Sequence, residues 1–129
     1  RGRWELINDN PTTIVDVCHN EAGLKASLAT LQDYPYESLH IVFGLSGDKD
    51  VDTMVRLLPL STVYCCRSSV PRAMEPERIE NAAKNRGLIT FVHDEPTKAL
   101  DVACNNAGFN DIVLVLGSIF LIADILQDH

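Results

Sequence analysis

The chain has 129 residues, of which 46% are hydrophobic and 22% are charged, and this balance predicts one soluble globular domain with a proper core. Its formal net charge is −7 and its eleven Lys and Arg residues are scattered. This pattern argues against nucleic-acid binding, because phosphate binding needs clustered cations. The most apolar stretch, residues 112–126, is interrupted by polar residues and is too short to span a bilayer, so we expect no membrane segment.

Short β-rich runs alternate with helical stretches along the chain. This alternation predicts an α/β fold, a three-layer Rossmann-like domain with a mostly parallel sheet of about six strands and helices on both faces. The first two strands, at residues 4–7 and 12–17, are joined so tightly that they must be antiparallel. The remaining strands are expected at residues 40–43, 62–65, 89–92 and 111–115. Helices are expected over about residues 20–32, 50–58, 76–86, 96–108 and 119–126.

The domain organisation is simple. We find no internal repeat, low-complexity tract or inner boundary, so residues 1–129 are expected to form a single domain. A strand begins almost at the first residue, which is what we expect of a domain excised from a longer enzyme.

The four cysteines have no metal-type spacing, and we expect them to be buried and reduced, which fits a cytoplasmic protein. Cys65 and Cys66 are neighbours at the end of an apolar run. Their side chains are therefore expected on opposite faces of a strand.

Candidate functional residues gather where predicted strands end and helices begin, in residues 16–21, 44–50 and 117–118. In open α/β sheets, ligands bind beyond the carboxyl ends of the strands, where helix N-termini also attract anions. Asp16 could accept hydrogen bonds from a ribose diol and His19 could hold an anionic group. Their spacing equally allows Asp16 to cap the next helix and His19 to be a solvated loop residue.

The other loops also allow two interpretations each. Residues 44–50 lack the phosphate-loop pattern, so they form either a ligand-facing loop or a tight turn that Asp50 caps while Lys49 is solvated. Ser118 is predicted to cap the last helix, with a second duty for its hydroxyl left open. Arg67 and Arg72 either steer anions or lie in a solvated loop. Residues 93–95 are expected to cap the helix that follows them.

Taken in order, these segments resemble the C-terminal domain of the folylpolyglutamate synthase/dihydrofolate synthase family, a branch of the Mur ligase superfamily. The Asp-x-x-His-Asn segment is shared widely across the superfamily, whereas Gly-Asp-Lys-Asp points to the folate branch. The segments that carry the resemblance are Gly2-Arg3-Trp4-Glu5, Asp16-Val17-Cys18-His19-Asn20, His40-Ile41-Val42-Phe43-Gly44, Gly47-Asp48-Lys49-Asp50 and Gly117-Ser118-Ile119-Phe120.

The resemblance implies a function. Enzymes of this family join an amino acid, usually L-glutamate, to a folate or dihydropteroate carboxylate through an acyl phosphate made from ATP. ATP and Mg²⁺ would be held mainly by an N-terminal or central ATPase domain, which would be the partner of this domain. The domain alone would be inactive and would hold no metal.

The resemblance also implies roles for individual residues. Arg3 and Asp16 would contact the nucleotide, with Asp16 on the ribose. His19 and Ser118 would hold the amino acid. The residues expected near the cleft are Asn20, Lys49 and Asp50.

Two positions depart from the family pattern. Glu21 stands where the family usually has proline, and Cys18 where a small residue such as alanine is common. Three alternatives stay open: a peptidoglycan-type Mur ligase that adds another amino acid, a receiver-like signalling module, and a free-standing nucleotide-binding or interaction domain without catalysis.

Overall fold

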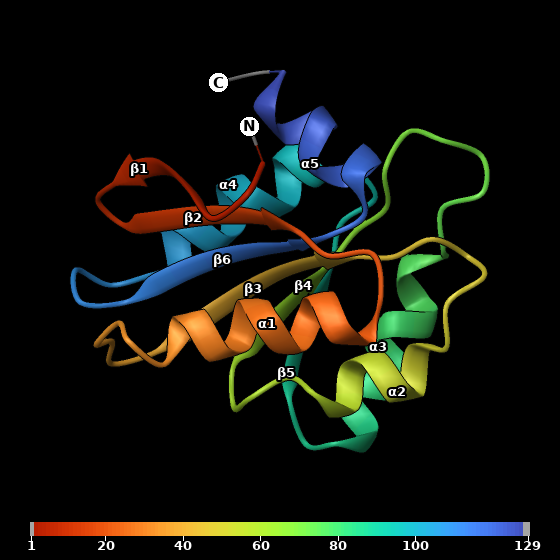
Figure 1. Ribbon diagram of the computed structural model, residues 1–129, viewed down its shortest axis with the longest axis horizontal. Helices are drawn as coiled ribbons and strands as arrows, with labels where there is room; N and C mark the ends of the chain where they lie inside the picture. The colour runs from red at the N-terminus through yellow and green to blue at the C-terminus, as the bar shows by residue number, and fades with distance from the viewer. Residues whose placement is uncertain (1, 128–129) are drawn as a thin grey trace.

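A central sheet with helices on both faces forms the framework of the computed structural model, which describes residues 2–127 (Figure 1). The strands are β1 (Glu5–Asp9), β2 (Thr12–Val17), β3 (Leu39–Gly44), β4 (Thr62–Cys65), β5 (Ile89–Val92) and β6 (Ile112–Gly117). The helices are α1 (Glu21–Leu31), α2 (Val51–Arg56), α3 (Pro76–Asn85), α4 (Pro96–Asn106) and α5 (Ile119–Leu126).

The strand order is β1-β2-β6-β3-β4-β5, and β1 alone runs antiparallel to its neighbour. The predicted fold class is therefore confirmed. The first strand begins later than expected, because Trp4 has a positive φ of 44° and cannot continue an extended strand. The last strand is longer than expected, because its pairing with β2 and β3 continues to Gly117.

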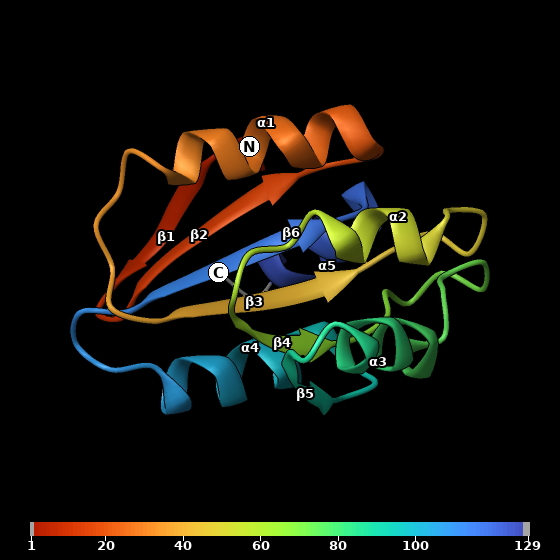
Figure 2. The ribbon, with the colours of Figure 1, turned by 90° about the horizontal axis from the view of Figure 1, so that it is seen from below.

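Apolar side chains fill a core on each face of the sheet. Alternate residues of the central strands belong to different cores, as with Ile41 and Val42 of β3. One core includes side chains of α1, α2 and α3, and the other includes those of α4 and α5. Figure 2 shows α1 and α4 on opposite sides of the sheet. Cys65 and Cys66 point into different cores, as predicted, whereas Cys104 is half-buried rather than buried.

Side-chain caps start α1, α2 and α5, whereas α3 and α4 start with a proline and have no side-chain cap. Asn20, Asp50 and Ser118 each cap a helix through a side-chain oxygen. The predicted capping of α4 by residues 93–95 is wrong, because Glu95 occupies the N-cap position without a side-chain hydrogen bond and Pro96 starts the helix. No helix within residues 2–127 is long and apolar enough to cross a membrane.

The topology brings three strand ends together. The chain passes from β2 to β3 across the place that β6 fills, so the carboxyl ends of β2, β6 and β3 are adjacent. Gly117 pairs with Val17 on one side and with Gly44 on the other. Its φ is 149°, and a Cβ at this position would overlap the Gly44 carbonyl oxygen. Only glycine lets the backbones approach this closely at the reversal of strand order.

Candidate functional site

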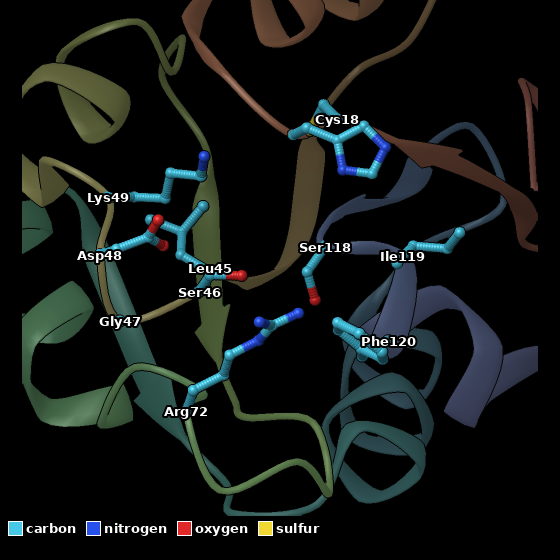
Figure 3. Close-up of a pocket in the computed structure, with 11 residues that line it drawn as sticks. Cys18, Leu45, Ser46, Gly47, Asp48, Lys49, Arg72, Ser118, Ile119 and Phe120 are labelled. Atoms are coloured by element: carbon cyan, nitrogen blue, oxygen red, sulfur yellow. The ribbon is translucent and has the colours of Figure 1, made fainter.

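A cavity of about 590 Å³ opens at the carboxyl ends of the parallel strands (Figure 3). It lies where the strand order reverses, which is the expected ligand position in a fold of this kind. Segments that follow β2, β3, β4 and β6 form its walls. The lining residues are Cys18, His19, Leu45, Ser46, Gly47, Asp48, Lys49, Arg72, Ser118, Ile119 and Phe120.

His19 enters this cavity from the short connection between β2 and α1. Its side chain is exposed, and it makes no hydrogen bond or ion pair with any of residues 2–127. His19 also lines a smaller neighbouring hollow of about 190 Å³, where Arg3 lies. The imidazole is therefore placed between the main cavity and Arg3, with both ring nitrogens open to a ligand.

Ser118 caps α5 and lines the cavity. Its Oγ accepts a hydrogen bond from the Leu121 backbone N–H at 3.1 Å and so caps α5, as predicted. Its own backbone N–H donates to the Gly44 carbonyl at 3.2 Å, which fixes the residue at the strand end. The hydroxyl hydrogen remains available to a ligand in the cavity, because the capping bond uses only an oxygen lone pair.

The loop after β3 forms the wall that carries Lys49. Backbone hydrogen bonds tie this loop to the segment after β4, from Gly47 N–H to the Arg72 carbonyl at 2.8 Å and from Met74 N–H to the Leu45 carbonyl at 2.9 Å. Lys49 is half-buried and lines the cavity, so it is not simply solvated. This tie gives the loop a defined position relative to Arg72.

Asp50 and Asn20 lie beside the cavity but outside its lining. Asp50 accepts a hydrogen bond from Thr53 N–H at 3.2 Å, and this bond lowers the pKa of its carboxyl. Asn20 accepts from Gly23 N–H at 2.8 Å. Both side chains therefore serve as helix caps, and neither lines the cavity.

Arg72 also lines the cavity, a position that the sequence pattern does not predict. It belongs to the loop between β4 and α3, and its guanidinium lies 5.1 Å from the centre of the Phe120 ring. Figure 3 shows the guanidinium pointing toward Ser118 and Phe120. A cation held over an aromatic face keeps its N–H groups free for an anion. Arg67, in contrast, is paired with Glu75 at 2.8 Å, away from the cavity.

Asp16 does not line the cavity, although its strand ends there. Its Oδ2 accepts a hydrogen bond from the Ser27 hydroxyl at 2.5 Å, and its Oδ1 accepts one from Trp4 N–H at 3.1 Å. The expectation that Asp16 could cap the next helix is wrong, because Asn20 takes that position. The structure thus brings His19, Lys49 and Ser118 together in the cavity lining and places Arg3 beside His19. Asp16 lies outside the lining, hydrogen-bonded to Ser27 and Trp4.

The charges around the cavity favour an anionic ligand. Lys49 and Arg72 are cationic, Asp48 is the acidic residue of the lining, and the N-terminus of α5 adds partial positive charge. Cys18 contributes a neutral wall, because burial, helped by the nearby Asp16 charge, raises the pKa of its thiol to about 12. Within residues 2–127, no group of three His, Cys, Asp or Glu side chains is placed to hold a metal ion.

Comparisons with known proteins agree with this geometry. Residues 2–119 match the family model described as Mur ligase, glutamate ligase domain. A probable bifunctional folylpolyglutamate synthase/dihydropteroate synthase of Haloferax volcanii is 31% identical over 125 residues, which cover 95% of this chain and 15% of that protein. The dihydrofolate synthase/folylpolyglutamate synthase of Bacillus subtilis is 26% identical over 96% of this chain and 29% of its own length.

Solved structures share the fold. The bifunctional folylpolyglutamate synthase/dihydrofolate synthase of Yersinia pestis, complexed with AMPPNP and a Mn ion, superposes with a TM-score of 0.89 at 22% identity. The match covers 98% of this chain and 30% of that one, so the chain spans less than a third of these relatives. A receiver-like signalling module is therefore the wrong interpretation. The chain belongs to the Mur ligase family and corresponds to its glutamate ligase domain.

Proposed function

We propose that this domain is the C-terminal part of an ATP-dependent folylpolyglutamate synthase/dihydrofolate synthase. The complete enzyme would add L-glutamate to a dihydropteroate or folate carboxylate by way of an acyl phosphate. Family membership supports the class of reaction, and the folate-branch relatives support this choice of acceptor. The enzyme would act in the cytoplasm, in keeping with its free cysteine thiols.

The observation that carries the proposal is the match between the charges of the cavity and those of glutamate. At neutral pH glutamate carries two carboxylates and one ammonium. The cavity offers two cations, Lys49 and Arg72, and one carboxylate, Asp48. His19 and Ser118 add hydrogen-bonding groups that could fix the orientation of the bound amino acid. The domain would thus hold the attacking amine in place, which lowers the barrier by avoiding the loss of translational and rotational freedom at the moment of reaction.

The nucleotide would bind on the side of the cavity where Arg3 and Asp16 lie. Arg3 is exposed beside His19, so its guanidinium could reach a phosphate or base of ATP held by a preceding domain. ATP and Mg²⁺ would supply the activated acyl group, and the ATPase domain would hold both. This domain would orient the amino acid and exclude water when the two domains close, and alone it would turn over no ATP.

A peptidoglycan-type ligase is the second candidate, and one observation favours it. The diaminopimelate ligase of Listeria monocytogenes is 26% identical over 128 residues, as similar as the folate enzyme of Bacillus subtilis. Diaminopimelate also carries two carboxylates, but it has two ammonium groups. The acceptor-binding part of the enzyme would distinguish the candidates.

The deciding experiment is a ligase assay on the full-length protein that carries this domain. Purified protein is incubated with ATP and Mg²⁺, with L-glutamate or meso-diaminopimelate, and with dihydropteroate, a reduced folate or a muramyl dipeptide acceptor. Product is identified by mass spectrometry. We expect amide formation with L-glutamate and a pteroate or folate acceptor. Product from diaminopimelate and the muramyl acceptor alone would support the second candidate, and absence of all products would refute both.

A further inference from the structure

The loop between β4 and α3, residues 66–75, contacts both of its neighbours around the cavity, the segment after β3 and helix α5. Towards β3, the Arg72 carbonyl accepts a hydrogen bond from Gly47 N–H at 2.8 Å, and Ser46 and Ala73 form an antiparallel bridge. These contacts belong to the backbone. They fix the main chain of Arg72 and leave the direction of its side chain to other interactions.

Helix α5 holds the same loop through Asp124. Oδ2 of this carboxylate accepts a hydrogen bond from Ser69 N–H at 2.9 Å, and Oδ1 accepts one from the Ser69 hydroxyl at 3.2 Å. Hydrogen bonds to a carboxylate are stronger than those between neutral groups, so the pair of bonds keeps the loop against the helix. Asp124 follows Phe120 by four residues, which puts the two side chains on the same face of α5.

Phe120 meets the side chain of Arg72 on that face. The guanidinium carbon lies 5.1 Å from the centre of the Phe120 ring, and Figure 3 shows the guanidinium beside the ring and directed toward Ser118. The ring attracts the cation electrostatically without using its N–H groups. The side chain of Arg72 is exposed and has no hydrogen bond or ion pair within residues 2–127, so the ring contact is the interaction that orients its guanidinium.

Core packing and helix capping do not account for Phe120 or Asp124. Phe120 is half-buried and belongs to neither hydrophobic core, and it lines the cavity instead. Asp124 lies inside α5, away from the N-cap position that Ser118 occupies. What the two residues share is their contact with the loop that carries Arg72.

We propose that Phe120 and Asp124 are positioning residues, which hold the β4–α3 loop against α5 and so keep the guanidinium of Arg72 across the cavity. Arg72 then meets a carboxylate of the amino acid already oriented, and less side-chain freedom is lost on binding. The identity of that ligand rests on the proposed function, whereas the connection between the loop and the helix does not.

The connection is tested by limited digestion of the full-length protein with trypsin, which cleaves after Arg72. Cleavage of the Arg72–Ala73 bond is followed by mass spectrometry in the wild type, in Asp124→Ala and in the matched control Asp101→Ala, an exposed carboxylate on α4. We expect the rate to rise at least about threefold in Asp124→Ala, because proteolysis needs local opening of the loop, and to stay unchanged in the control. An unaltered rate in Asp124→Ala would refute the connection.

Cleavage after Lys84, inside α3, separates opening of the loop from general unfolding. It should stay slow in Asp124→Ala, and a rise equal to that at Arg72 would mean that Asp124 stabilises the whole domain, against the proposal. If Asp124→Ala does not fold, Asp124→Asn and Ser69→Ala each weaken the connection more mildly. We expect a smaller rise at Arg72 in both, and wild-type rates in both would contradict the proposal.

The role of Phe120 is tested in the full-length enzyme by the KM for the amino acid that the ligase assay identifies, which we expect to be L-glutamate. Phe120→Leu keeps an apolar side chain but removes the ring. We expect it to raise this KM about fivefold with little change in kcat, because the guanidinium loses its orientation while the reacting groups are untouched. An enzyme that is merely destabilised would lose kcat instead.

Two further variants control for the loss of the ring. Phe120→Tyr keeps the ring and should retain the wild-type KM. Phe109→Leu changes an exposed ring near the amino end of β6, far from the cavity, and should also leave the KM unchanged. An unchanged KM in Phe120→Leu, or an equal rise in Phe120→Tyr, would overturn the role of the ring.

A double-mutant cycle shows whether both residues act through Arg72. Arg72→Ala is expected to raise the KM about tenfold, and adding Phe120→Leu or Asp124→Ala should raise it no further. Effects that multiply would mean an independent role for the added residue and contradict the proposal. If Arg72→Ala leaves the KM unchanged, the proposed place of Arg72 in the amino-acid site is wrong, while the trypsin data still decide whether Asp124 holds the loop.

Discussion

The sheet has one edge at the carboxyl ends of the parallel strands and an opposite edge at their amino ends. The two edges carry similar polar residues but use them differently. At the carboxyl ends of the strands, His19, Lys49 and Arg72 line a cavity, and within residues 2–127 their side chains form no hydrogen bond or ion pair. At the opposite edge, His40 is only 7% exposed and contacts Tyr64 Oη at 2.9 Å and Asp111 Oδ2 at 3.0 Å. Polar groups at one edge are left for a ligand, and those at the other satisfy one another.

The opposite edge is a closed hydrogen-bond network. Asn106 donates to Tyr64 Oη at 3.3 Å, and Asp111 also accepts from the backbone N–H groups of Gly108 and Ser38. Such a network stabilises the fold only because each member has a partner. The comparison teaches that His40, with both ring nitrogens engaged inside the fold, has a structural role, whereas the ring nitrogens of His19 are free to meet a ligand.

The largest effect is expected at the junction of β3 and β6, where the backbones of Gly44 and Gly117 approach closely. Gly117→Ala would force a Cβ onto the Gly44 carbonyl, so we expect it to lower the free energy of unfolding by about 4 kcal/mol or more, or to prevent folding. Gly87→Ala is the matched control, because Gly87 also has a positive φ but open space around a Cβ, and it should cost about 1 kcal/mol. Urea unfolding measures both, and equal losses would show that the close approach is unimportant.

At the opposite edge, Asp111→Ala should remove the centre of the network. We expect a loss of about 2–3 kcal/mol at pH 7, because three donors lose a charged acceptor. The Gly108 N–H bond, followed by the contacts with His40, holds the pKa of Asp111 below its usual value of 3.8. Its stabilisation is therefore complete above about pH 5 and is lost as the pH falls through the lowered pKa.

The control for this second prediction is Asp101→Ala, an exposed carboxylate on α4. Urea unfolding at pH 7 and at pH 3 should show that Asp111→Ala loses less stability on acidification than the wild type and Asp101→Ala do. Parallel losses in all three proteins would mean that Asp111 does not carry the pH dependence.

At the cavity edge, the kinetic effect of Arg72→Ala sharpens the comparison. Removing a guanidinium that faces an anionic ligand should raise the KM for L-glutamate about tenfold in the full-length enzyme, with little change in stability. Arg67→Ala is the matched control, since Arg67 lies in the same loop but pairs with Glu75. Equal kinetics in the two variants would remove Arg72 from the ligand site.

The smallest effect is expected at Asn20, which the resemblance places near the cleft but the structure uses as a cap. Asn20→Ala should cost about 1 kcal/mol in the free energy of unfolding, measured in urea, and should leave the KM for glutamate and ATP unchanged. Asn81→Ala, at an exposed position inside α3, serves as the control. A clear rise in either KM would return Asn20 to the ligand site.

Local sequence patterns predict the fold well because its elements are locally encoded. The predicted ends of β2, β4 and β5 agree with the structure, and Ser118 and Asp50 cap the helices expected of them. The predicted start of β1 is wrong at Trp4, whose turn is held by contacts distant in sequence, with Asp16 and Tyr34, as well as by the local hydrogen bond from Gly2 N–H to the Glu5 carboxylate.

The site is harder to predict, because its geometry depends on loops far apart in sequence. Arg72 reaches the cavity only because the loops after β3 and β4 are joined by backbone hydrogen bonds, which leave no pattern in the side chains. Asp16 is engaged by Ser27, eleven residues later, and nothing in the motif around Asp16 signals this partner. Glu21, which departs from the family pattern, is exposed and lies 3.9 Å from Lys25.

The glycine pair at the junction of β3 and β6 has a consequence for how the domain could diversify. Gly44 and Gly117 do not line the cavity, and a Cβ at Gly117 would overlap the Gly44 carbonyl oxygen, so recognition cannot be retuned at Gly117 without disturbing the junction. The lining residues Ser46, Asp48, Lys49 and Arg72 lie in loops, where replacement is tolerated better than in the strands. A change in the preferred amino acid would therefore arise by exchanging these loop residues over an unchanged strand junction, and engineering of specificity should begin in the loops after β3 and β4.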